Sequence, residues 1–69
     1  MRKYNCTTSG RSTTYFVVVV ADDEQHATEM AQVRARQKWG SGIAGQRWNV
    51  EYVDSGYSSP ARILDFGTI

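Results

Sequence analysis

Two side chains in this 69-residue chain, Cys6 and His26, have the chemistry of a nucleophile and a general base. There is one residue of each type, and neither belongs to a pair at metal-ligand spacing, so a zinc site would have to be completed by carboxylates. A small core residue of a strand explains Cys6, and an exposed first-turn helix residue explains His26. We therefore expect no catalytic residues, no metal and no cofactor, and predict that the protein is not an enzyme.

Three consecutive acidic residues, Asp22, Asp23 and Glu24, could hold a metal ion or begin a helix. Carboxylates at a helix N-terminus accept hydrogen bonds from unpaired backbone N–H groups and face the positive end of the helix dipole. We predict capping, by Asp22 or by Asp23. If Asp22 is the cap, Gln25 occupies the reciprocal position of a capping box.

Glycines at 40, 42 and 45 suggest a phosphate-binding loop at first sight. Such a loop follows a strand and leads into a helix, so that backbone N–H groups point at the anion. Here the glycines follow a predicted helix and lead into a predicted strand. We predict a plain, mobile connection over residues 40–46, anchored only by Ile43.

Basic residues gather around the end of the predicted helix, at Arg34, Arg36, Lys38 and Arg47. Cations are favoured at a helix C-terminus, and this accounts for some of them. Arg34 and Lys38, however, lie four residues apart on one side of the helix, and arginine is a preferred anchor at protein interfaces. With Tyr57, from a turn-rich segment, these four residues form the predicted partner-binding site.

The elements that must position these residues follow from periodicity. Alternating residues 2–8 and the apolar run 15–21 predict two strands joined by a short turn, and residues 24–39, followed by Gly40, predict a helix. Residues 47–53, with Trp48, Val50 and Tyr52 facing inward, and residues 62–66 predict two more strands. The expected fold class is α+β, with ββαββ order and one helix packed on one face of a mainly antiparallel four-stranded sheet. The whole chain, 1–69, forms a single small domain.

The run from Tyr15 to Ala21 is apolar at every position, although successive side chains of a strand point to opposite faces. A single helix covers one face of a sheet. The sequence therefore predicts that the second face of this strand is left to a second copy of the chain, a partner protein or water, and an external partner is the favoured interpretation.

Composition limits the partners. The net charge of +1 lacks the positive excess of a dedicated nucleic-acid binder, which makes nucleic acid possible but less expected. A single cysteine cannot form a disulfide within the chain, which suits a reducing cytosol. Residues 4–14 are too polar for a signal peptide. The valine run is too short to cross a bilayer. We expect a cytoplasmic protein without membrane contact.

The valine-rich strand running into an acidic cap and an alanine-rich helix resembles a large set of very small phage- and prophage-encoded proteins. Among these it is similar to some type I anti-CRISPR proteins, which pair a helix with a small antiparallel sheet. The resemblance is one of pattern and transfers no functional residue. It implies a non-enzymatic inhibitor or adaptor that binds a host protein complex, such as a CRISPR surveillance complex, and occludes a site on it. Two alternatives remain, a small nucleic-acid-binding or transcription-regulating protein and a structural homodimer.

Overall fold

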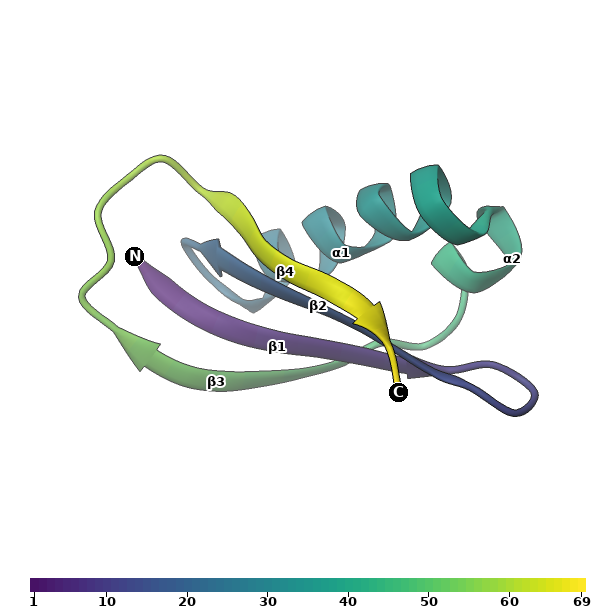
Figure 1. Ribbon diagram of the computed structural model, residues 1–69. Helices are drawn as coiled ribbons and strands as arrows, with labels where there is room; N and C mark the ends of the chain where they lie inside the picture. Colours follow the sequence, from purple (N-terminus) through teal and green to yellow (C-terminus); the bar gives the residue numbers. More distant parts are fainter.

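The computed structural model describes all residues, 1–69, as one sheet with a helix behind it (Figure 1). The elements follow the predicted order, with one short helix added. They are β1 (Arg2–Ser9), β2 (Thr14–Ala21), α1 (Glu24–Trp39), α2 (Ser41–Ala44), β3 (Asn49–Ser55) and β4 (Arg62–Thr68). The α+β fold with a helix packed on a four-stranded sheet is confirmed.

The sheet is antiparallel throughout, with the order β3-β1-β2-β4. The β1–β2 hairpin forms its centre, with Cys6 opposite Val17 and Tyr4 opposite Val19. The two later strands are added to its two sides, so both are edge strands. Because α1 runs back along the hairpin, its C-terminal end, the hairpin turn and the start of β3 share one end of the molecule (Figure 1). We call this the hairpin end.

The helix begins and ends where the sequence predicts. Asp23 is the N-cap, because its Oδ1 accepts a hydrogen bond of 2.8 Å from the His26 N–H. Asp22 instead lies 3.6 Å from the His26 Nδ1. At the other end Gly40 has a φ of 97°, which ends the helix and is a backbone conformation that favours glycine.

Replacement of Asp23 with Ala should lower the free energy of unfolding by about 1 kcal/mol, because one N–H of the first helical turn loses its acceptor. The matched control is Asp22→Ala, which removes only an exposed contact to His26 and should cost less than about 0.5 kcal/mol. Urea unfolding followed by circular dichroism measures both. Equal losses would contradict the assignment of Asp23 as the cap.

Three alanines bring α1 close to the sheet. Ala27, Ala31 and Ala35 are fully buried, and the predicted stripe is completed by half-buried Met30 and Trp39. Facing them are the buried side chains of the two central strands, namely Tyr4, Cys6, Val17, Val19 and Ala21. Large side chains on the sheet thus pack against small ones on the helix, which gives a small domain a continuous core.

The second face of β2 is less exposed than the sequence predicts. Val20 is fully buried, and Phe16 and Val18 are half-buried. The Phe16 ring lies directly against Gly67, where a side-chain Cβ would come within 3.1 Å of it. The prediction that this face needs an external cover is therefore only partly supported, because the chain itself covers much of it.

Residues 40–46 are not the predicted plain connection, since Ser41–Ala44 form the short helix α2. The anchor also differs, because Ala44 is buried and Ile43 only half-buried. The Trp48 indole N–H donates a hydrogen bond of 3.1 Å to the Ala44 carbonyl. Glycine content concealed this helix, which tertiary packing of Ala44 and Trp48 holds in place.

Both later strands differ from their predicted limits. β3 begins two residues late, at Asn49, and β4 continues to Thr68 because β2 offers it pairing partners as far as Tyr15. The prediction that Tyr52 is a core residue is wrong. Its side chain is 51% exposed, because β3 is an edge strand and α1 lies mainly over the central hairpin.

Candidate functional site

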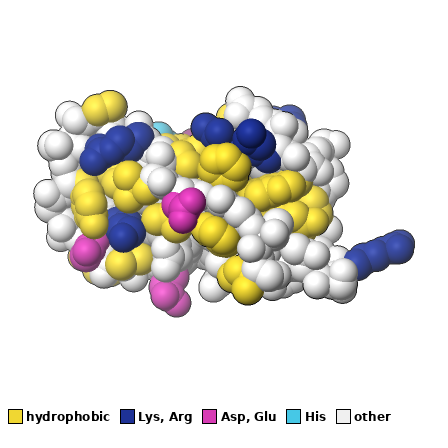
Figure 2. All heavy atoms as spheres, in the orientation of Figure 1, with side chains coloured by type: hydrophobic (Ala, Val, Ile, Leu, Met, Phe, Trp, Pro, Cys, Tyr) yellow, Lys and Arg dark blue, Asp and Glu magenta, His cyan; other side chains and the backbone are white.

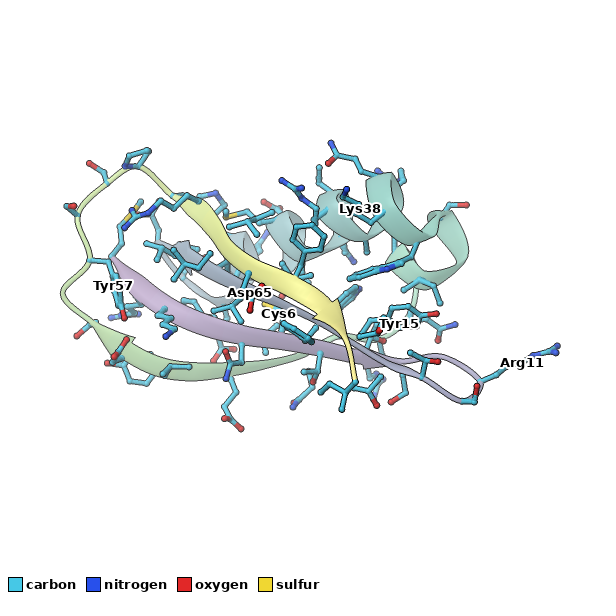
Figure 3. All side chains as sticks on the ribbon, in the orientation of Figure 1. Cys6, Arg11, Tyr15, Lys38, Tyr57 and Asp65 are labelled. Atoms are coloured by element: carbon cyan, nitrogen blue, oxygen red, sulfur yellow. The ribbon has the colours of Figure 1, made fainter.

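The five predicted partner-binding residues do not form one surface. Arg34 and Lys38 lie together on the β4 side of α1, whereas Arg36 is exposed elsewhere on the same helix. Arg47 precedes β3 at the hairpin end. Tyr57 lies at the opposite end of the molecule from Lys38 (Figure 3). The structure thus brings together only Arg34 and Lys38.

Arg34 and Lys38 share one aromatic ring. The Arg34 guanidinium carbon lies 5.0 Å from the centre of the Phe66 ring, and the Lys38 Nζ lies 5.3 Å from it. Each such cation–π contact contributes about 0.5–1 kcal/mol at an exposed site. The two cations lie four residues apart on α1, where like charges repel each other.

No carboxylate neutralises this pair. The one contact within salt-bridge distance in the molecule joins His26 and Asp22, so neither Arg34 nor Lys38 has an acidic partner at that distance. The Arg34 Nε is buried and has no hydrogen-bond acceptor. A buried N–H without an acceptor carries a desolvation cost of about 1–3 kcal/mol. The chain therefore leaves two charges and one donor without the anion that would satisfy them.

Aromatic packing holds the Phe66 ring in place. Phe66 meets Trp39 edge to face, with ring centres 6.3 Å apart, and Trp39 in turn packs against Tyr15 at 4.8 Å. These residues come from β4, α1 and β2, so three elements fix the platform beneath the two cations. A rigid aromatic surface loses little side-chain entropy on binding.

Apolar side chains continue the surface along the junction of α1 and β4. Met30, Val33 and Ile63 line a shallow hollow there together with the polar residues His26 and Glu29, and Val33 is 51% exposed. Figure 2 shows hydrophobic side chains gathered along this junction, with basic groups beside them. We name these six residues the α1–β4 surface, namely Met30, Val33, Arg34, Lys38, Ile63 and Phe66.

The sequence did not identify Phe66, Met30, Val33 or Ile63 as parts of this site. The apolar spacing of residues 62–66 predicted only a strand, and Met30 was assigned to the buried stripe of the helix. No sequence signal showed that β4 pairs with β2 and so lies next to α1. The i, i+4 spacing of Arg34 and Lys38 was the one usable signal, and the structure places both side chains on the same side of α1, over the Phe66 ring.

Cys6 is a core residue of β1, as predicted. It is fully buried, and its thiol donates a hydrogen bond of 3.8 Å to the Ala27 carbonyl. Burial raises the pKa of Cys6 to about 11. The thiol is therefore protonated at neutral pH, which removes the thiolate that a nucleophilic cysteine needs.

This raised pKa predicts a pH-dependent stability. The unfolded chain releases the thiol proton near its ordinary pKa of about 8.5, whereas the folded chain keeps it up to about pH 11. The contribution is thus complete below about pH 8.5 and is lost as the pH rises toward 11. Between about pH 8.5 and about pH 11, we expect the free energy of unfolding to fall less for Cys6→Ala than for the unsubstituted protein. Urea titrations at a series of pH values measure this. Parallel pH profiles would contradict a raised pKa.

Tyr57 belongs to the β3–β4 connection and is half-buried, not the exposed contact that the sequence suggested. The neighbouring Asp54 carboxylate favours the protonated phenol and so raises the pKa of Tyr57. The backbone N–H groups of Gly56 and Tyr57 both donate to the Met1 carbonyl at 3.1 Å. Tyr57 thus fixes this connection against β1.

No family model, curated protein or solved structure matches the chain. Neither helix is both long and apolar enough to span a lipid bilayer.

Proposed function

We propose that this protein is a non-enzymatic binding protein that inhibits or adapts a protein complex by occluding an acidic site through the α1–β4 surface. The observation that carries the proposal is the pair Arg34 and Lys38 on the Phe66 ring, with no carboxylate of the chain within salt-bridge distance of either cation. A partner carboxylate would neutralise both charges.

The neighbouring residues suit a protein partner. Protein interfaces combine aromatic and arginine anchors with an apolar centre, and the α1–β4 surface offers Phe66, Arg34 and the hollow beside Val33. The resemblance to type I anti-CRISPR proteins adds one partner class, a bacterial host complex in the cytoplasm. It contributes no residue to the argument.

A photo-crosslinking amino acid at position 33 tests the proposal in bacterial cells. The matched control is position 52, because Val33 and Tyr52 are both 51% exposed but lie on α1 and on the β3 edge. We expect one cross-linked protein from position 33 and none from position 52. A cross-link from position 52 alone would place the interface on the other side of the molecule and overturn the proposal.

A further inference from the structure

The charges of this nearly neutral chain are separated along its length. All seven acidic residues fall within residues 22–29 and 51–65, whereas residues 1–21 and 30–50 contain no Asp or Glu. Those two acid-free segments carry seven of the eight cations. Arg2 and Lys3 begin β1, and the other five are Arg11, Arg34, Arg36, Lys38 and Arg47. The net charge of +1 therefore conceals a basic region. A nearly neutral molecule can bind nucleic acid through such a region, although its net charge lacks a positive excess.

The fold brings much of both acid-free segments to the hairpin end. The turn of the β1–β2 hairpin, the last turn of α1, α2 and the start of β3 all lie there (Figure 1). Arg11 projects from the hairpin turn away from the body of the protein (Figure 3). Arg11, Arg36 and Arg47 are exposed, and none of them forms an ion pair.

A polar hollow lies at this end of the molecule, and Arg47 is the cation in its lining. β1 pairs with β2 as far as Ser9 but with β3 only as far as Thr7, and the hollow lies between this end of β1 and residues 46–49. Its polar lining includes Thr7, Ser9, Gln46, Arg47 and Asn49. Trp48 is the only apolar residue in its lining, and no carboxylate lines the hollow.

Two hydrogen bonds fix the chain around the hollow. The Thr8 hydroxyl donates to the Arg47 carbonyl at 2.8 Å, and the Trp48 indole donates to the Ala44 carbonyl at 3.1 Å. Both use backbone oxygens, so the Arg47 guanidinium is left exposed and the segment stays in place when the side chain of residue 47 is changed. The hollow at the other end of the sheet differs, because Asp23 and Glu24 line it.

From this arrangement we infer that the hairpin end is a second binding surface, which takes the phosphodiester backbone of a nucleic acid. Arginine, serine, threonine, asparagine and glutamine are the side chains that contact phosphate and sugar. Several exposed cations at one end of the molecule, around a hollow without a carboxylate, suit an extended polyanion better than a single ion. The scarcity of apolar lining disfavours a protein partner here, since interface centres are apolar and aromatic. This inference does not rest on the α1–β4 surface.

Fluorescence anisotropy with labelled single-stranded and duplex oligonucleotides, at salt between about 50 and about 200 mM, tests the inference. The variants are Arg47→Glu and Arg11→Glu, and the matched control is Arg2→Glu. Arg2 is exposed at the opposite end of the sheet, and every variant changes the net charge from +1 to −1, since one cation becomes one anion. Circular dichroism verifies that each variant is folded.

We expect Arg47→Glu and Arg11→Glu each to weaken binding about tenfold and Arg2→Glu to leave it nearly unchanged. Each lost phosphate contact should also reduce the slope of log K against log salt by about 0.9 for duplex DNA or about 0.7 for single strands. No binding at the lowest salt would overturn the inference, as would equal losses in all three variants. Displacement by polyglutamate as efficient as by unlabelled oligonucleotide would also overturn it, since the site would then not prefer phosphodiesters.

Discussion

Ala31→Leu should lower the free energy of unfolding by about 1–3 kcal/mol. Ala31 is fully buried between α1 and the central strands, so three extra carbon atoms would push the helix away from Cys6 and Val17 or force strained rotamers. A chain of 69 residues has a total stability of roughly 3–10 kcal/mol, so this single change removes a large part of it.

The control for this substitution is Gln37→Leu on the same helix. Gln37 is exposed, and Leu and Gln have similar helix propensities, so its stability should change by less than about 0.5 kcal/mol. Urea unfolding of the two variants makes the comparison. If Ala31→Leu proves as stable as Gln37→Leu, the close approach of α1 to the sheet is wrong.

The helix and the central hairpin were predictable because each carries local signals that agree with the final packing. An acidic cap and Gly40 mark the two ends of α1, and the period of the alanines matches its buried face. The hairpin needs only a short turn between two strands. Residues close in sequence determine both elements.

The remaining features depend on contacts between distant residues. Nothing in residues 62–66 indicates pairing with β2, so the position of Phe66 under Arg34 and Lys38 had to come from the structure. The helix α2 forms although two of its flanking residues and one internal residue are glycines, because Ala44 is buried. The absence of acidic residues from two segments is visible in the sequence, but only the fold shows that both segments reach one end.

Removal of both charges from the α1–β4 surface should have the largest effect on partner binding. In Arg34→Gln/Lys38→Gln, the Phe66 platform and the hollow beside Val33 remain, while both charge-assisted contacts to a partner carboxylate are lost. A hydrogen bond to a charged group contributes about 1.5–3 kcal/mol, so two contacts amount to about 3 kcal/mol or more. This corresponds to a loss of about 100-fold in affinity.

The matched control is Arg11→Gln/Arg36→Gln, which removes the same charge from exposed positions outside the α1–β4 surface. It should change the affinity for the protein partner by less than about threefold, because only long-range attraction is reduced. A similar loss in both double variants would indicate attraction by overall charge and not contact through the α1–β4 surface.

The most direct measurement is the Kd of the partner cross-linked from position 33, determined by isothermal titration calorimetry with the unsubstituted protein and both double variants. The α1–β4 surface predicts a Kd about 100-fold weaker for Arg34→Gln/Lys38→Gln and nearly unchanged for the control. The same Kd for Arg34→Gln/Lys38→Gln and for the unsubstituted protein would contradict a role of this surface in binding.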